Sequence, residues 1–321
     1  MGRMIEGRWH AGEATAGNEG GAFKREDSGF RRWITPHGEP GPDGQDAVPA
    51  AAGRYHLYVS HACPWAHRTM IVRALKGLDS LVDVSVVDPL MREDGWTLKG
   101  RDGGSGDRIG ERRFLHQVYA AARPDYTGKV TVPVLWDREQ NAIVNNESSE
   151  VIRIFNQAFD DLGAAPGDFY PPALRTDIDA VNDRVYRTLN NGVYRCGFAT
   201  SQDAYDEAVG PLFETLDWLE ARLAGSDWLV GDQMTEADIR LFTTLIRFDP
   251  VYHIHFKCSV KRIADYPALS RFVARMMGDD RIAATVHFDQ IKAHYYRSHV
   301  DLNPSGIVPA DPVPLVPGTI G

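Results

Sequence analysis

One cysteine, Cys63, stands where a strand-like segment ends and a helix-like segment begins, within YHLYVSHACPWAHRT. Pro64 follows it directly, and proline is typical of the first turn of a helix. The backbone N–H groups and the positive dipole end at a helix start favour the thiolate, which is the nucleophilic form of cysteine. The pattern therefore predicts a reactive thiol, against the alternative of a small buried apolar residue.

Position 66 carries alanine, where a C-x-x-C dithiol would carry its second cysteine. Cys63 therefore cannot resolve its own mixed disulfide with a neighbouring thiol. The disulfide has to be resolved by a small thiol from solution. This favours an enzyme that takes a small thiol off its substrate over one that adds it.

The segment TVPVL places Pro133 inside a run of strand-forming residues. Proline donates no hydrogen bond, so Pro133 is expected at an edge, bulge or turn, and the bond from Val132 is a candidate for the cis form. The backbone of Val132 would then pair with an extended peptide-like ligand as an added strand. The alternative is an ordinary strand start.

The segment NNESSE places Glu147 and Ser148 directly before an apolar, helix-like run. Ser148 and the nearby amides can hold a carboxylate at the helix N-terminus, and Glu147 can hold an ammonium group. The alternative is a simple N-cap with exposed acids.

Composition excludes several classes of protein. The 321 residues are 43% hydrophobic and 25% charged, as in ordinary globular chains, and the net charge of −9 leaves no broad basic surface for nucleic acid or anionic lipid. Three cysteines form no disulfide framework and favour a reducing compartment. Without an apolar signal segment or a membrane-length run, we expect a cytoplasmic protein with no nucleic-acid or membrane partner. No G-x-G-x-x-G follows a strand and no H-E-x-x-H occurs, so we expect neither nucleotide nor metal.

The elements that must position these residues alternate in the first half of the chain. Strand-forming runs predict strands at 55–60, 81–89, 129–137 and 142–147, and helical periodicity predicts helices at 65–78, 114–122 and 148–159. This order predicts a two-layer α/β domain over residues 51–160. Residues 1–50, rich in Gly, Pro, Ala and charge, are expected to form a mostly irregular N-terminal extension.

The second half carries helical patterns only. A Gly- and Pro-rich linker is expected at 161–172, followed by helices that include 177–190, 205–223 and 266–277. Thr235 and Asp238 have capping-box spacing, with Asp in place of the usual Glu or Gln. We predict an all-helical domain over 173–296 and a Pro-rich tail over 297–321.

Cys63, Val132-Pro133 and Glu147-Ser148 occur in the order typical of the glutathione transferases, which the sequence resembles. It resembles their Xi class, the glutathionyl-hydroquinone reductases, more closely still. The long blocks that carry this resemblance are SHACPWAHRT, DGWTL, VTVPVLWD, NNESSEVIRIFN, NNGVYRCGFATSQDAYDEAV, MTEADIRL, RFDPVYHIHFKC, HYYRSH and NPSGIVP, which spread over nearly the whole chain. The resemblance implies an α/β thioredoxin-like domain that binds glutathione, followed by an all-α substrate domain.

The resemblance also implies roles for single residues. Val132 would pair with the cysteinyl backbone of glutathione, Glu147 and Ser148 would meet its γ-glutamyl end, and Trp96 would cover the peptide. Lys129 stands where the family often has an arginine, which places a single ammonium where a bidentate guanidinium contact is usual.

Tyr194 and Tyr295 match family tyrosines whose hydroxyls face the phenolic substrate, and Tyr296 is a further substrate-binding candidate. Ordinary half-buried tyrosines are the alternative for Tyr194 and Tyr295. His61 and His67 flank the thiol and His299 lies near the tyrosines, and the sequence leaves the roles of these histidines open.

By resemblance, the reaction is glutathione-dependent reductive deglutathionylation of glutathionyl-hydroquinones through a Cys63–glutathione mixed disulfide, in a homodimer. Two alternatives stay open. One is an omega-like thiol transferase or dehydroascorbate reductase that uses the same cysteine. The other is a non-enzymatic binding protein of the same fold.

Overall fold

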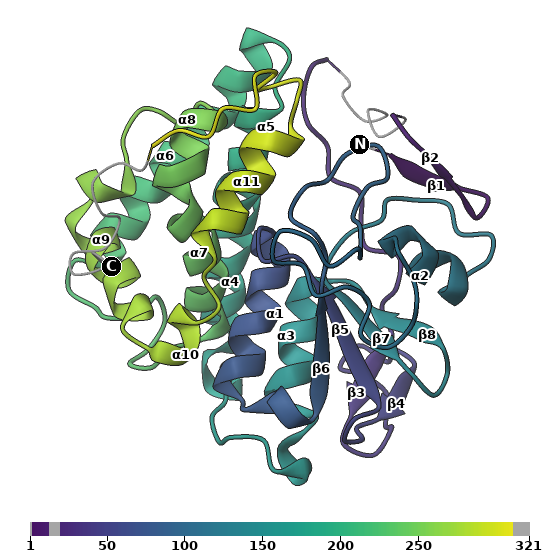
Figure 1. Cartoon of the computed structure of the whole chain (residues 1–321). Coiled ribbons are helices and arrows are strands. Elements are labelled where there is room, and N and C mark those ends of the chain that lie inside the picture. Colours follow the sequence, from purple (N-terminus) through teal and green to yellow (C-terminus); the bar gives the residue numbers. More distant parts are fainter. Residues whose placement is uncertain (1, 13–19, 311–321) are drawn as a thin grey trace. The chain divides into compact units, whose positions relative to one another are not determined.

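Strand β5, in which all residues of Tyr55–Val59 are buried, lies inside a four-stranded sheet of the computed structural model (Figure 1). The strand order is β6-β5-β7-β8. Strand β6 (Val82–Val86) pairs with β5 in parallel, β7 (Val134–Asp137) pairs with β5 antiparallel, and β8 (Ala142–Asn145) pairs with β7 antiparallel. The apolar runs that predicted these strands therefore form one mixed sheet.

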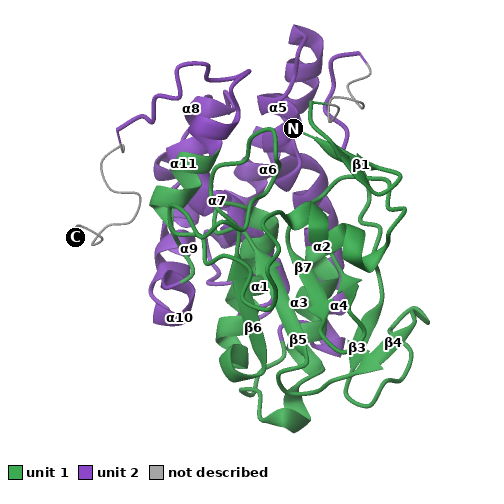
Figure 2. Ribbon diagram, turned by 45° about the vertical axis from the view of Figure 1, so that its right-hand side comes forward, with its two compact units in different colours: residues 1–16, 26–168, 285–294 green, residues 17–25, 169–284, 295–321 purple. Residues whose placement is uncertain are grey.

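The structure describes residues 2–12 and 20–310, which group into two units (Figure 2). Of the described residues, 2–12, 26–168 and 285–294 belong to unit 1, and 20–25, 169–284 and 295–310 belong to unit 2. Residues 311–321 of the predicted tail and 13–19 of the predicted extension lie outside the described residues. The change of unit after residue 168 falls within the predicted linker.

Three helices of unit 1 accompany the sheet. Helices α1 (Pro64–Leu75) and α3 (Ser148–Gln157) lie side by side against it, and α2 (Leu115–Ala122) lies on its other side (Figure 1). Helix α1 ends before the predicted Leu78 because Gly77 adopts a φ of 62°, which glycine tolerates without strain.

The N-terminal region differs from the predicted irregular extension, because short strands form in it. Strands β1 (Arg3–Ile5) and β2 (Arg8–His10) form an antiparallel hairpin, and β3 (Trp33–Thr35) and β4 (Ala47–Pro49) pair in parallel. The Arg32 amide donates to the Val144 carbonyl, which covers the β8 edge of the sheet. These partners are distant in sequence, so local composition did not reveal the pairing.

The regular elements of unit 2 are helices, and none of the strands β1–β8 belongs to its described residues. Its helices are α4 (Arg175–Val185), α5 (Gly192–Gly197), α6 (Gln202–Leu223), α7 (Glu236–Arg247), α8 (His253–His255), α9 (Pro267–Met277) and α10 (Asp280–Ala283). Helix α11 (Phe288–Ser298) begins in unit 1 and ends in unit 2. The wider turns Tyr186–Asn190 and Phe248–Tyr252 are π-helical, the second one around Pro250, which has no N–H to donate. No described helix is both long and apolar enough to cross a membrane.

The predicted capping box forms at the start of α7. The Asp238 carboxylate accepts a hydrogen bond from the Thr235 amide at 2.8 Å, and the Asp238 amide donates to the Thr235 side chain. Asp238 also accepts from the Leu229 amide at 2.9 Å, and its side chain is fully buried. One aspartate therefore satisfies donors on both sides of the turn before α7.

We expect Asp238→Ala to lower the thermal midpoint of helix loss by roughly 5 to 10 °C, because it leaves buried donors of Leu229 and Thr235 without an acceptor. Circular dichroism at 222 nm measures this. Asp238→Asn retains one carbonyl acceptor and should cause a smaller shift. Equal midpoints for the alanine variant and the native chain would contradict this role.

Candidate functional site

Strand direction brings the predicted pieces of unit 1 to one edge of the sheet. Strands β5, β6 and β8 end at this edge and β7 begins there, as shown by the pairs Val59↔Val86, Tyr58↔Val134 and Leu135↔Asn145. Cys63 follows β5, Trp96 follows β6, Val132 precedes β7, and Glu147 follows β8. The segments that the sequence singled out therefore share one edge, which is a common place for ligand sites in α/β sheets.

Cys63 is the N-cap of α1, with an extended backbone, and Pro64 is the first helical residue. The helix begins with a hydrogen bond from the His67 amide to the Cys63 carbonyl at 3.0 Å. The Cys63 side chain is only partly buried, whereas Cys196 and Cys258 are buried. Cys63 is thus the cysteine that combines exposure with a helix start.

The thiol of Cys63 donates toward the Val132 carbonyl at 3.6 Å, and the Val132–Pro133 bond is cis, the form that the sequence suggested. The structure gives the Val132 amide no hydrogen-bond acceptor within residues 2–12 and 20–310. A backbone donor therefore lies next to the thiol, as the pairing with an extended peptide requires.

Glu147 is the N-cap of α3 and Ser148 its first residue. Burial alone would raise the pKa of Glu147. Its carboxylate accepts from the Ser149 amide and hydroxyl and from the Ser28 hydroxyl, and these bonds, together with the Arg68 charge, lower the pKa below its ordinary value. Glu147 thus carries a stable negative charge at this edge.

Arg68 is a residue of this edge that sequence reasoning missed. It lies on α1, is 1% exposed, and places its guanidinium 4.5 Å from the Trp65 ring centroid. One of its nitrogens donates to the Ser148 hydroxyl at 3.4 Å. Its position five residues after Cys63 was the available signal, but only the packing of α1 on α3 shows what it contacts.

Trp96 is 7% exposed and stacks on His294, with ring centroids 4.8 Å apart. Lys129 places its ammonium 3.6 Å from the Glu26 carboxylate. Both residues belong to unit 1.

The histidines next to the thiol contact the part of unit 1 that comes from residues 285–294. His61 stacks on His287 with centroids 3.7 Å apart, and the Nε2 of His67 lies 2.8 Å from the Thr285 hydroxyl. His67 is 2% exposed, so it is a core residue of this contact.

The predicted tyrosines of unit 2 lie together, although 101 positions separate them. The Tyr194 and Tyr295 hydroxyl oxygens are 2.7 Å apart, and that of Tyr252, which the sequence did not indicate, is 3.1 Å from Tyr295. Burial raises the pKa of Tyr252 and Tyr295 well above the ordinary tyrosine value, and proximity to Tyr194 adds to the shift. These two hydroxyls therefore stay protonated and can donate hydrogen bonds.

The N-terminal region also contributes to this hydroxyl cluster, defined as Tyr194, Tyr252 and Tyr295. The Arg25 guanidinium lies 4.9 Å from the Tyr194 ring centroid and donates to the Asn191 side chain at 2.6 Å. A cation over the ring attracts its electron-rich face and holds Tyr194 in place.

The other aromatic candidates have partners within unit 2. The Tyr296 hydroxyl donates to the Pro250 carbonyl at 2.9 Å, and the residue is 2% exposed. The His299 Nδ1 lies 3.1 Å from the His255 Nε2. The substrate-binding role of Tyr296 stays a prediction, with its hydroxyl already engaged.

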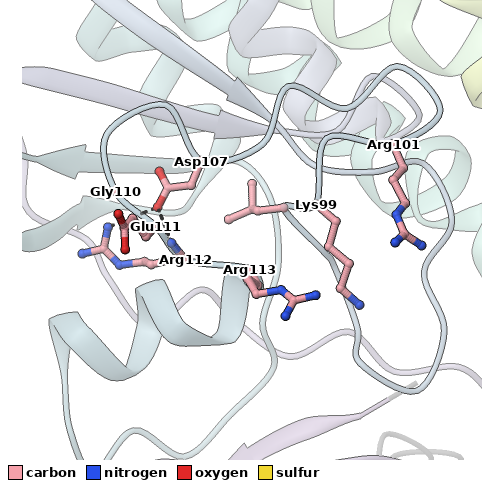
Figure 3. Close-up of a pocket in the computed structure, with 8 residues that line it drawn as sticks. Lys99, Arg101, Asp107, Gly110, Glu111, Arg112 and Arg113 are labelled. Atoms are coloured by element: carbon pink, nitrogen blue, oxygen red, sulfur yellow. Dashed lines mark hydrogen bonds and ion pairs between the residues drawn. The ribbon is translucent and has the colours of Figure 1, made fainter.

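A separate pocket of about 300 Å³ lies in the loop between β6 and α2 (Figure 3). It is lined by Leu98, Lys99, Arg101, Asp107, Gly110, Glu111, Arg112 and Arg113. The pocket contains none of the predicted site residues, and Arg112 pairs there with Asp107 at 3.5 Å. In the part of the chain that the structure describes, no group of three or more His, Cys, Asp or Glu side chains could hold a metal.

Two family models match the chain. One, described as Glutathione S-transferase, N-terminal domain, matches residues 62–158, and the other, described as Glutathione S-transferase, C-terminal domain, matches residues 202–275. The first match contains Cys63, Val132 and Glu147, and the second contains the capping box and Tyr252.

Relatives match almost the whole chain. The glutathionyl-hydroquinone reductase PcpF of Sphingobium chlorophenolicum is 53% identical over 320 residues, with 99% of this chain and 98% of the relative covered. The glutathione-bound structure of YqjG, a glutathione transferase homolog from Escherichia coli K-12, has a TM-score of 0.89 and 52% identity, with 97% and 96% covered. The glutathione-S-transferase Xi from Phanerochaete chrysosporium has a TM-score of 0.87 and 49% identity, with 92% and 95% covered.

We expect Tyr295→Phe to lower the thermal midpoint more than Tyr252→Phe. Both changes remove one hydroxyl from a buried ring, but Tyr295→Phe removes the bonds of Tyr295 to Tyr194 and to Tyr252, at 2.7 and 3.1 Å, whereas Tyr252→Phe leaves the shorter of these two bonds in place. At about 1 kcal/mol for each bond, the shift for Tyr295→Phe should be roughly twice as large. Differential scanning calorimetry compares the two, and the reverse order would contradict the arrangement.

Proposed function

We propose that this chain, which belongs to the glutathione transferase family and to its Xi class, is a glutathione-dependent glutathionyl-hydroquinone reductase. The predicted fold, a thioredoxin-like α/β domain followed by an all-helical domain, is confirmed. The observation that carries the proposal is the Cys63 thiol at the start of α1, beside the Val132 backbone and without a second cysteine at position 66.

Glutathione is proposed to bind along the sheet edge of unit 1. The amide and carbonyl of Val132 would pair with its cysteinyl residue, which directs the glutathione sulfur toward Cys63. The negative charge of Glu147 suits the γ-glutamyl ammonium, and the Ser148 hydroxyl beside the Arg68 guanidinium suits its carboxylate. Trp96 and Lys129 are proposed to contact the rest of the peptide.

The first step is attack of the Cys63 thiolate on the glutathione sulfur of the substrate. A sulfur–sulfur bond forms, and the bond between that sulfur and the aromatic carbon breaks. The electron pair of the broken bond stays on the carbon, which takes a proton and becomes free hydroquinone. The thiol is oxidised to a mixed disulfide and the aromatic carbon is reduced.

The second step regenerates the thiol. Because residue 66 is alanine, a second glutathione thiolate attacks the glutathione sulfur of the mixed disulfide. Glutathione disulfide leaves and Cys63 returns as the thiolate. The two steps together consume one glutathione and one glutathionyl-hydroquinone.

The hydroxyl cluster is proposed to act on the phenolic part of the substrate. Tyr194 and Tyr295 would donate to a phenolic oxygen and support proton transfer as the carbon–sulfur bond breaks. The raised pKa of Tyr295 supports this, since a hydroxyl that never ionises near neutral pH remains a donor. A homodimer and a cytoplasmic location are further parts of the proposal that rest on the resemblance and composition.

We expect Cys63→Ser to lower turnover of a glutathionyl-hydroquinone by roughly 1,000-fold or more, because a serine hydroxyl is a poor nucleophile and forms no disulfide. Release of hydroquinone, followed by chromatography, measures it. Cys196→Ser and Cys258→Ser, which change buried thiols, serve as matched controls and should retain turnover.

Mass spectrometry gives the second readout for the same residue. The native protein treated with glutathione disulfide should carry one glutathione on Cys63, and Ala66→Cys should reduce the yield by supplying an internal resolving thiol. Near-native turnover of Cys63→Ser, or an adduct on another cysteine, would refute the mechanism.

We expect Tyr194→Phe to lower turnover of glutathionyl-hydroquinones by roughly 10- to 100-fold, because it removes a donor to the phenolic oxygen while the bond between Tyr295 and Tyr252 remains. Reduction of a small glutathione mixed disulfide, which needs only Cys63 and the peptide site, should change little. The ratio of the two rates is the measurement.

Equal loss on both substrates would mean that Tyr194 is structural. No loss on either would place the phenol elsewhere and favour the thiol-transferase alternative.

A further inference from the structure

Residues 285–294 comprise the first part of α11 and the three residues before it. They belong to unit 1, although the rest of unit 1 lies before residue 169. They make polar or ring contacts with residues at the thiol edge and in the loop after β6. Thr285 meets His67, His287 meets His61, Gln290 donates to the Gly103 carbonyl at 3.5 Å, and His294 meets Trp96. These contacts point to a role in holding the glutathione-binding edge.

His294 makes two contacts of different kinds with one loop. Its Nδ1 lies 2.8 Å from the Pro89 carbonyl, which can only accept, so Nδ1 carries the hydrogen. Its ring stacks on Trp96 at 4.8 Å with an interplanar angle of 19°. One end of the imidazole is thus anchored on the backbone while its face sets the plane of the indole.

The loop between these contacts is otherwise tied together through its backbone. The Asp88 amide donates to the Thr97 carbonyl at 2.8 Å, and the Asp88 carboxylate accepts from the Thr97 hydroxyl and the Lys99 amide. These bonds fix the main chain on either side of Trp96 but leave the rotation of its indole to be set by ring contacts. His294 makes such a contact, and at 6% exposure it is itself held in place.

We propose that His294 is a positioning residue for glutathione, which acts by holding the indole of Trp96 in the orientation that contacts the bound peptide. The inference rests on the proposed function in taking Trp96 as part of the glutathione site. The proposal makes a specific statement about glutathione binding: the loss of His294 weakens binding only while the indole of Trp96 is present.

A double-mutant cycle tests this dependence. The cycle is made in the Cys63→Ser background, which binds glutathione without forming a disulfide, and the dissociation constant of glutathione is measured by titration calorimetry. Trp96→Ala and His294→Ala should each weaken binding by about 3- to 10-fold, as expected for the loss of one ring contact. The double variant should bind no more weakly than Trp96→Ala alone, because the effect of His294 passes through the indole.

Two further variants separate positioning from general structure. His294→Phe keeps a flat ring against Trp96 but loses the bond to Pro89, so it should restore part of the affinity that His294→Ala loses. Arg297→Ala changes an exposed residue one turn further along the same helix and should leave binding as it is. Circular dichroism midpoints check that all variants are folded.

Several outcomes would overturn the inference. These are an unchanged affinity for His294→Ala, losses that multiply in the double variant, or a His294→Phe variant as weak as the alanine one. Failure of the Cys63→Ser parent to bind glutathione at all would instead refute the proposed function, so the two failures are distinguishable.

Discussion

The direction of the strands in the four-stranded sheet is the constraint on which the thiol site depends. Because β5, β6 and β8 run one way and β7 runs the other, Cys63, Trp96, Val132 and Glu147 all lie at one edge. A register shift of one residue between β5 and β7 would turn the side chains of a strand to the opposite face and displace Val132 from the thiol. Because β5 is buried on both faces, such a shift would force side chains packed on one face to fit the differently shaped core on the other face, and this cost in packing resists the shift.

The two units offer different electrostatic environments, and the difference matches the two halves of the proposed substrate. At the sheet edge of unit 1, hydrogen bonds from Ser149 and Ser28 keep the buried Glu147 carboxylate charged, and the guanidinium of Arg68 donates to the Ser148 hydroxyl. Such charges suit the ionised ends of a peptide. In the hydroxyl cluster of unit 2, burial raises the pKa of Tyr252 and Tyr295, so these two side chains stay neutral. Neutral hydroxyl donors suit the phenolic oxygens of the aromatic half, which are neutral hydrogen-bonding groups.

Several residues of the candidate site contribute through contacts that span most of the chain. Arg25 lies over the ring of Tyr194, and the segment 285–294 supplies partners for His61, His67 and Trp96. His294 begins the HYYRSH block, but no sequence pattern in either region predicts these contacts. Arg25 and the segment 285–294 matter because they hold Tyr194, His61, His67 and Trp96 in place. The sequence indicated those four side chains but not the residues that contact them.

Local features were determined by the sequence alone. Pro64 after Cys63, the capping box of Thr235 and Asp238, and the strand-forming run at β5 each depend on neighbours within a few residues, and so were predicted close to where they form. The order of the thiol, the Val-Pro pair and the acidic helix start also pointed to the family. Only the tertiary structure decided three contacts. The hydroxyl oxygens of Tyr194 and Tyr295 lie 2.7 Å apart although 101 positions separate the residues, Tyr252 hydrogen-bonds Tyr295, and His294 stacks on Trp96. The physical reason is that such contacts, and the pKa shifts that burial causes, depend on how distant segments pack, and no local pattern of residues encodes that packing.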